Sequence, residues 1–502
     1  MSIAIQDLRS VRRELAEARG RKKIDLLLES ADPLALVRAL PPQELYLTLL
    51  EVGPEDSAEV VALASAEQFR HFIDLSAWPR SDEGPREGEV IRWLRIAREG
   101  AGGRHLGRIR GQIRGLDIEL LALVLRRELT VHELSEDNQP DPENPNLAYY
   151  TSDRRFLLEF KTERDFVALK EVIEDLYAQE PFAAGRLLET IRWEVPTELE
   201  ETARRWREGR LRDLGVPGFE EALSFYARPA VRPDAPATAT TALTVPGKPL
   251  LDEALDLLNG AELETAEEAL VYASNAALVA NRVDLNEATD VREQLADARA
   301  TLSLGLEVLS AGDPREAAHL LVEVPVREIF QAGMGEAYKL QTRARKVAAA
   351  LRLPQAQSTT LLDEPLESAV QALLKVRPML HEPGKRRPRA LGSRADVLLA
   401  QGYLDEAVKV TELLTTLDLA PARLGPLAEA AGLGPAAVKA SAAIYALIES
   451  QLRNEPLSLS LLLDEARPRS TGFDEKLRAL VPGPQSLKTA LEKLYPLERL
   501  NS

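Results

Sequence analysis

The side chains that most often perform chemistry in proteins are scarce in this sequence. Its 502 residues include no cysteine, which excludes disulfides, thiolate catalysis and cysteine-ligated metal sites. The five histidines are His71, His105, His132, His319 and His381. No two of them stand three or four positions apart, so no helix face offers a preformed histidine pair to a metal ion. We therefore expect no catalytic residue, no metal site and no cofactor, and the sequence favours a non-enzymatic protein while leaving an enzyme open.

Arginine is the residue type whose spacing does suggest binding chemistry. The chain carries a net charge of −17, and two basic clusters interrupt this acidic background. A guanidinium group can bind a carboxylate or a phosphate through two parallel hydrogen bonds. The candidate partner-binding residues are Arg104, Arg108, Arg110 and Arg114 in the first cluster and Lys385, Arg386, Arg387 and Arg389 in the second. The wider clusters also contain Arg92, Arg95, Arg98, Lys375, Arg377 and Arg394.

Three interpretations of these clusters are open. The basic side chains can pair with carboxylates of the same chain, dock an acidic protein partner, or bind nucleic acid. Trp93 is the only aromatic residue within either cluster, which disfavours a stacking platform for single-stranded nucleic acid. The acidic net charge also disfavours nucleic acid as a partner. We therefore expect a protein partner rather than a nucleic acid.

The elements that must position these residues are helices. Apolar residues make up 45% of the chain and charged residues 28%, a composition that can build a folded core. Asp32-Pro33 predicts a helix start, with Asp as the N-cap and Pro at the first helical position. A weak internal repeat at an offset of 23 aligns Val37, Leu40, Glu44, Tyr46 and Leu49 with Val60, Leu63, Glu67, Phe69 and Phe72. Short helix pairs that bury their apolar sides by stacking are typical of an α-solenoid.

One segment breaks the helical pattern. Aromatic and aliphatic runs at 147–150 and 155–160 flank the polar residues 151–154, which predicts a β-hairpin at about 147–160. It is the only convincing strand signal in the sequence. Helices are then expected near 163–179, 182–192 and 197–207, the last opened by a capping box of Thr197 and Glu200.

The second half of the chain is also expected to be helical. An apolar stripe predicts a long helix through Val291, Leu295, Ala298, Leu302, Leu306 and Leu309. Gly333 and Gly335 stand inside another helical stretch, where each glycine costs about 1 kcal/mol relative to alanine. Their presence predicts the close approach of another helix. Pro229, Pro233, Pro236 and Pro246 interrupt residues 229–249 and indicate a linker.

The sequence thus predicts an all-α fold with superhelical, α-solenoid-like lobes and one small β-hairpin. The expected organisation is an N-terminal helical domain at 1–228, a linker at 229–249 and a C-terminal helical domain at 250–502. The N-terminus lacks a basic region followed by an apolar run, and no apolar run approaches the length of a membrane span. We expect a cytoplasmic protein without membrane insertion.

Two family resemblances add to this reading. The segment Leu40-Pro41-Pro42-Gln43-Glu44-Leu45, followed by Pro54-Glu55-Asp56, resembles the cytosolic N-terminal domain of MgtE-type magnesium transporters. That domain is a superhelix of short helices, and the flagellar motor switch protein FliG carries a similar one. The resemblance covers about residues 25–130 and implies a fold, not transport.

The whole chain resembles an uncharacterised bacterial family of similar length, a domain of unknown function. The positions that carry this resemblance are Asp74-Leu75 with Trp78, Phe156 to Phe160, Leu214-Gly215 with Glu221-Ala222-Leu223, and Phe330 to Gly333 with Leu340 and Arg343-Ala344. The resemblance implies no activity.

We therefore expect a non-catalytic cytoplasmic interaction or scaffold protein that binds a protein partner through helical surfaces. One alternative is an enzyme or small-molecule sensor with a pocket between helical lobes. A second alternative is nucleic-acid binding through the arginine-rich clusters.

Overall fold

The computed structural model describes residues 20–78, 84–102, 106–136, 139–228, 248–463 and 469–480. Internal contacts divide the chain into two units. Unit 1 comprises Met1–Ala222 and Leu278–Gln294, and unit 2 comprises Leu223–Ala277 and Leu295–Ser502. Residues 229–247 of the expected linker lie outside the described residues, and the expected domain boundaries stay a prediction.

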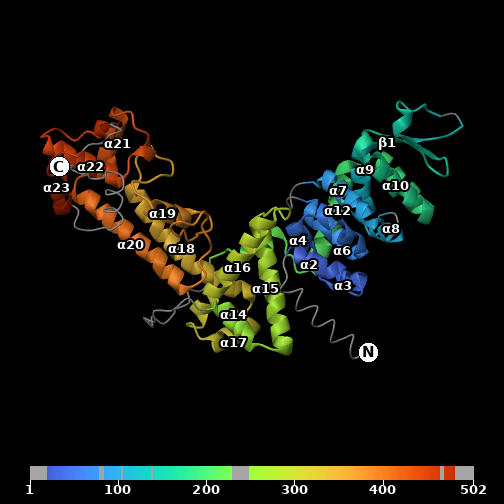
Figure 1. The fold of residues 1–502 in the computed structure, drawn as a ribbon, viewed down its shortest axis with the longest axis horizontal. Helices are drawn as coiled ribbons and strands as arrows, with labels where there is room; N and C mark the ends of the chain where they lie inside the picture. Colours follow the sequence, from blue (N-terminus) through green and yellow to red (C-terminus); the bar gives the residue numbers. More distant parts are fainter. Residues whose placement is uncertain are drawn as a thin grey trace. The chain divides into compact units, whose positions relative to one another are not determined.

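Unit 1 is built mainly from short helices (Figure 1). They are α2 (Arg21–Leu28), α3 (Pro33–Ala39), α4 (Pro42–Val52), α5 (Ala58–Leu63), α6 (Ala66–Ser76), α7 (Glu87–Ala101), α8 (Leu106–Arg114), α9 (Ile118–Glu128), α10 (Glu163–Gln179), α11 (Pro181–Trp193) and α12 (Pro196–Asp213). Helix α13 (Phe219–Ser224) runs across the boundary between the units. The core of unit 1 includes the buried rings of Tyr46, Phe72 and Trp93, with centroid separations of 5.2–6.2 Å.

Two buried glutamines repeat the same contact in this part of unit 1. The side chain of Gln68 on α6 donates to the carbonyls of Val37 and Leu40 at the end of α3. The side chain of Gln112 on α8 donates to Val61 and Ala64 at the end of α5 in the same way. Each glutamine thus satisfies helix C-terminal carbonyls that are buried away from water.

The expected hairpin is present within a three-stranded antiparallel sheet. Strand β2 (Ala148–Tyr150) pairs with β3 (Phe156–Phe160), which confirms the hairpin. A strand that the sequence analysis missed, β1 (Leu129–Glu133), pairs with the other edge of β3, so the strand order is β1-β3-β2. Every residue of β3 except Glu159 is buried. This burial follows from the position of β3 between β1 and β2.

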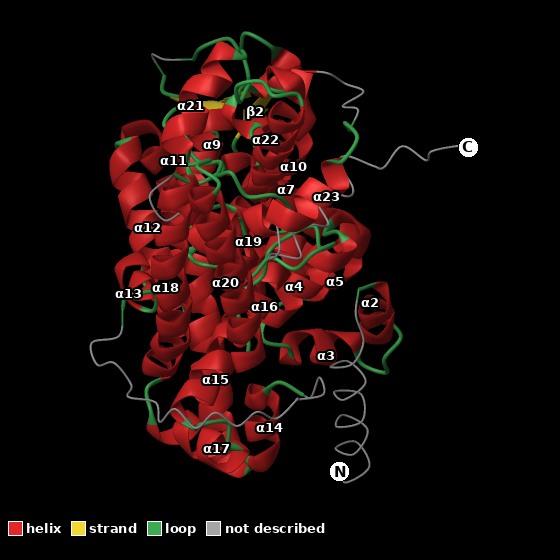
Figure 2. Cartoon of the chain, turned by 90° about the vertical axis from the view of Figure 1, so that its left-hand side faces the viewer, coloured by secondary structure: helices red, strands yellow, loops and turns green. Residues whose placement is uncertain are grey.

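Helices dominate the described chain (Figure 2), and unit 2 contains the longest of them. The helices of unit 2 are α14 (Leu250–Leu257), α15 (Gly260–Ala280), α16 (Ala288–Leu309), α17 (Pro314–Glu323), α18 (Val326–Leu351), α19 (Leu366–Leu374), α20 (Arg394–Thr416), α21 (Pro421–Ala430), α22 (Ala440–Leu452) and α23 (Phe473–Leu480). Helices α15 and α16 each run across a boundary between the units. The apolar stripe at 291–309 lies on α16 as expected.

The expected close approach of helices at Gly333 is confirmed. A Cβ atom at Gly333 on α18 would lie 2.2 Å from the carbonyl oxygen of Thr301 on α16. A Cβ atom at Gly305 on α16 would lie 1.9 Å from the carbonyl oxygen of Ile329. Both distances are far inside van der Waals contact, so the two helix backbones touch at a pair of glycines.

The sequence predicts two helix starts from their capping residues, and one prediction is confirmed while the other is wrong. Asp32 caps α3 by accepting from the backbone N–H of Ala35, as predicted. The capping box at Thr197 is wrong, because α12 begins at Pro196 and its N-cap is Val195. A capping box does occur at Ser65 with Gln68 at the start of α6.

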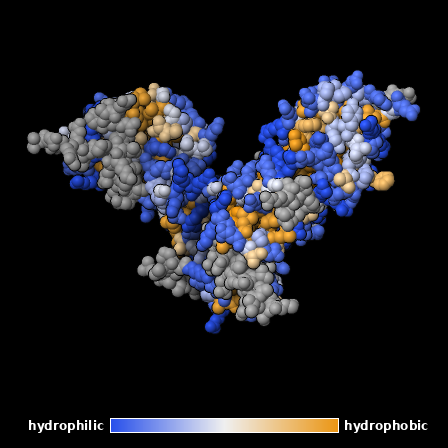
Figure 3. Space-filling model, turned by 45° about the vertical axis from the view of Figure 1, so that its right-hand side comes forward, coloured by the Kyte–Doolittle hydropathy of each residue, from blue (hydrophilic) through white to orange (hydrophobic). Residues whose placement is uncertain are grey.

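The mostly helical fold class with a small sheet is confirmed, while the α-solenoid arrangement stays a prediction. Among the described residues, no helix combines the length and the apolar character that crossing a membrane requires. Hydrophilic side chains cover much of the face shown in Figure 3, between smaller hydrophobic patches.

Candidate functional site

The first arginine cluster lies on α7 and α8, where acidic residues of α10 face it. Four ion pairs join these helices to α10 and to the residue after it. They are Arg95 with Asp165, Arg98 with Glu171, Arg110 with Asp175, and Arg114 with Glu180. The basic side chains at 110 and 114 therefore pair with carboxylates of the chain itself, and their binding of a partner stays a prediction.

Other members of this cluster have separate positions. The guanidinium of Arg92 binds both carboxylate oxygens of Glu55, at 2.6 and 2.9 Å. This hydrogen bonding lowers the pKa of Glu55 below its usual value. Arg104 and the side chain of Arg108 lie outside the described residues.

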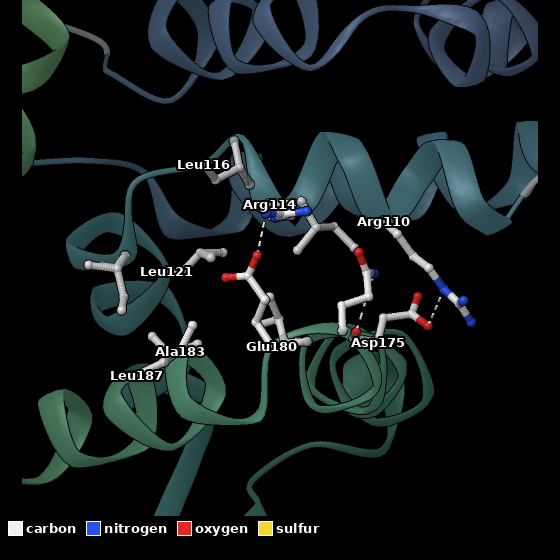
Figure 4. Close-up of a pocket in the computed structure, with 12 residues that line it drawn as sticks. Arg110, Arg114, Leu116, Leu121, Asp175, Glu180, Ala183 and Leu187 are labelled. Atoms are coloured by element: carbon white, nitrogen blue, oxygen red, sulfur yellow. Dashed lines mark hydrogen bonds and ion pairs between the residues drawn. The ribbon is translucent and has the colours of Figure 1, made fainter.

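A small pocket opens beneath the ion pairs of Arg110 and Arg114 (Figure 4). It has a volume of about 110 Å³ and lies between α8, α9, α10 and α11, entirely within unit 1. Its apolar floor is formed chiefly by Ile113, Leu116, Leu121, Leu176, Ala183 and Leu187. Figure 4 shows the Arg114–Glu180 and Arg110–Asp175 pairs side by side along its rim. The pocket thus combines an apolar floor with a rim that carries both signs of charge.

The second cluster forms a short hairpin-like loop in unit 2. Leu380 and Arg389 exchange backbone hydrogen bonds of 2.8 and 3.0 Å, which close the loop between them. The guanidinium of Arg389 binds both oxygens of Asp396 at 2.8 Å and also binds Glu382. Burial opposes ionisation of Asp396, but bonds from Arg389 and from the Gly392 N–H outweigh it and lower the pKa of Asp396. Arg389 is therefore engaged in holding the base of the loop.

The tip of this loop presents three further cations of the cluster. Gly384 has a φ of 80°, a left-handed conformation that favours glycine, and it turns the chain. Lys385, Arg386 and Arg387 follow it and are exposed. Within the described chain, the side chains of Lys385 and Arg386 form no hydrogen bond or ion pair. We refer to residues 380–389 as the basic hairpin.

The outer members of the second cluster lie apart from this tip. Arg377 stacks over the ring of Tyr226 at 3.9 Å from its centroid, and burial lowers the pKa of Arg377. The backbone N–H of Arg394 donates to Glu307 at 2.6 Å. Burial raises the pKa of Glu307, although this bond and the charge of Arg394 oppose the rise. Lys375 is exposed as a single cation, so among the described residues of this cluster the hairpin tip groups the exposed basic side chains.

Sequence reasoning missed a buried ionic network in unit 1. Arg210 on α12 binds both oxygens of Asp74 on α6, each at 2.8 Å. The same guanidinium binds both oxygens of Asp117, which precedes α9, at 3.0 and 2.7 Å. Arg207 donates to the backbone carbonyl of Asp74 at 2.7 Å. One arginine thus joins three helices of unit 1.

His71 borders this network. Its side chain is buried, and burial together with the charges of Arg207 and Arg210 lowers the pKa of His71 to about 4. The imidazole is therefore neutral near pH 7. The nearby Trp78 stacks against the guanidinium of Arg207, with 5.5 Å from its central carbon to the ring centroid. Asp74 and Trp78 carry part of the family resemblance in the sequence, but no sequence signal identifies Arg207 and Arg210 as their partners.

A model described as a family of unknown function (DUF6178) matches residues 2–460. No curated protein and no solved structure matches the chain, and the resemblance to MgtE-type transporters stays a prediction. Within the part of the chain that the structure describes, no group of three or more histidine, aspartate or glutamate side chains is arranged to hold a metal ion.

Proposed function

We propose that this chain, which belongs to the DUF6178 family, is a non-catalytic cytoplasmic interaction protein that binds an acidic segment of a protein partner with its basic hairpin. The observation that carries the proposal is the exposed basic tip on a fixed base. Lys385 and Arg386 are exposed, while Arg389 ties the base of the loop to Glu382 and Asp396. The hairpin therefore presents positive charge without first having to fold.

Electrostatic complementarity explains why the tip suits an acidic segment. The net charge of −17 repels acidic molecules at a distance, but screening limits that field to about 8 Å at physiological ionic strength. Within that range the local cations dominate. Exposed charge pairs contribute more to partner choice and association rate than to affinity. The hairpin is therefore a selectivity element within a larger contact surface.

A protein partner is better supported than a nucleic acid. Residues 383–388 at the tip contain no aromatic side chain on which a base could stack. The tip offers only three basic residues, so few phosphates would be neutralised and few counterions released. An acidic peptide segment requires fewer contacts of this kind.

Charge reversal tests the proposal. The full-length protein would be used as bait in its native host, with Lys385→Glu combined with Arg386→Glu. We expect the reversal to reduce recovery of the specific partner roughly tenfold, which corresponds to about 1.4 kcal/mol. The matched control is Arg345→Glu with Lys346→Glu, which reverses two exposed charges on α18.

Two further measurements decide between the classes of partner. Cross-linking from the tip should map to an acidic segment of the recovered protein. Recovery of nucleic acid that the tip reversal abolishes would favour the nucleic-acid alternative instead. Equal loss of the partner with both reversals would contradict the proposal, because the effect would then come from net charge alone.

A further inference from the structure

We propose that the pocket of unit 1 binds a free aliphatic α-amino acid of about the size of leucine. The pocket lies between α8, α9, α10 and α11, and both its floor and its rim belong to unit 1. The proposal is independent of the basic hairpin, which belongs to unit 2.

The floor determines the size and polarity of the side chain that fits. The volume of about 110 Å³ is several times what one water molecule needs, so the branched isobutyl group of leucine fits into it. Ile113, Leu121 and Leu187 are buried residues of the floor, so a branched aliphatic group there would contact apolar side chains on its inner side.

The rim determines the charged groups that the ligand must carry. Arg110 and Arg114 stand four positions apart, and therefore on one face of α8. Their carboxylate partners, Asp175 and Glu180, face them from the end of α10 and the residue that follows it. A zwitterion placed at the Arg114–Glu180 pair would direct its carboxylate to Arg114 and its ammonium group to Glu180. A free aliphatic α-amino acid carries this charge pair directly beside its aliphatic side chain.

The existing ion pairs do not prevent this exchange. The side chain of Arg114 is 61% exposed and that of Glu180 is 41% exposed, so their pair is strongly screened by water. Separating it costs little, and the zwitterion would replace each partner with a group of the same charge. The Arg110–Asp175 pair is less exposed and is expected to stay in place as a support.

Titration of the full-length protein with L-leucine tests the proposal, using calorimetry and saturation-transfer NMR on the leucine methyl groups. We expect saturable binding in the low millimolar range or tighter. Ala183→Leu fills the floor and should weaken leucine binding at least tenfold. Ala178→Leu makes the same change at an exposed position of α10 and should leave the binding unchanged.

Ligand analogues distinguish a free amino acid from other carboxylates. Leucinamide lacks the carboxylate, N-acetylleucine lacks the ammonium group, and alanine lacks the aliphatic body. Each should bind at least tenfold more weakly than leucine. A peptide that ends in leucine carries its ammonium group far away and should also bind weakly. Equal binding of N-acetylleucine or of this peptide would overturn the assignment to a free amino acid.

A second variant keeps the test decisive if Ala183→Leu does not fold. Arg114→Gln removes the exposed cation at the rim without changing the floor and should also weaken leucine binding. Binding of leucine that is unaffected by both variants, or the lack of saturable binding to the wild-type protein, would overturn the proposal.

Discussion

The ionic network centred on Arg210 allows a quantitative prediction about the stability of unit 1. The substitution Arg210→Leu removes the guanidinium that binds both Asp74 and Asp117. The side chain of Asp74 is only 2% exposed, so its carboxylate would remain buried without its main partner. Removing one member of a buried ion pair costs about 3–5 kcal/mol, mostly from the uncompensated charge that remains. We expect the free energy of unfolding of unit 1 to fall by that amount.

Tryptophan fluorescence isolates unit 1 within the full-length protein. All four tryptophans of the chain, at positions 78, 93, 193 and 206, belong to unit 1, and two of them are buried. Urea unfolding followed by fluorescence therefore reports on this unit alone. The control Arg212→Leu changes an exposed arginine of the same helix, and its effect should stay within about 0.5 kcal/mol.

A rescue experiment separates charge from packing in the same network. Adding Asp74→Asn to Arg210→Leu removes the uncompensated charge and should recover part of the lost stability. A loss below about 1 kcal/mol for Arg210→Leu would refute the reasoning, because it would mean that water reaches Asp74 and solvates it. Failure of the added Asp74→Asn to recover any stability would assign the loss to packing instead.

Three other predictions follow from buried groups. The depressed pKa of His71, about 4 against 6.5 unfolded, should cost unit 1 up to about 3 kcal/mol as pH falls from 6.5 to 4, and His71→Leu should reduce this slope in urea titrations. Gln112→Ala leaves the Ala64 carbonyl without its side-chain donor, removes one of two donors to the Val61 carbonyl, and should cost about 1–3 kcal/mol by fluorescence-detected unfolding. Gly305→Ala places a Cβ 1.9 Å from a carbonyl of α18 and should lower the melting temperature of unit 2 by calorimetry, whereas Gly402→Ala, which meets open space, should raise it slightly.

The sequence was most informative where a local cause determines the structure. Asp32-Pro33 started a helix as expected, because capping depends on neighbouring residues alone. Gly333 indicated a helix contact because glycine inside a helix is otherwise unfavourable. The capping box at Thr197 failed because a Thr and a Glu three positions apart are common, and Pro196 already occupied the first position of the helix.

The sequence was least informative about strand β1 and about partners that lie far apart along the chain. Residues 129–133 alternate apolar and polar side chains over only four positions, and they continue directly from α9 without a glycine or proline to mark where the helix ends. The partner of Arg110 is 65 positions away, and the distance from Arg210 to Asp74 is 136 positions. With 80 acidic residues in the chain, sequence alone does not select one of them for each arginine.

Burial, rather than clustering along the sequence, separates the roles of the basic residues. Arg210 stands outside both basic clusters, yet it is largely buried and holds two carboxylates at once. Arg389 belongs to a cluster, but its guanidinium is engaged with Glu382 and Asp396 and therefore supports the hairpin. Arg386 has the same charge in an exposed position without such a partner among the described residues. A cluster of arginines is thus a reason to search for a binding surface, and the engagement of each guanidinium decides which member can bind a partner.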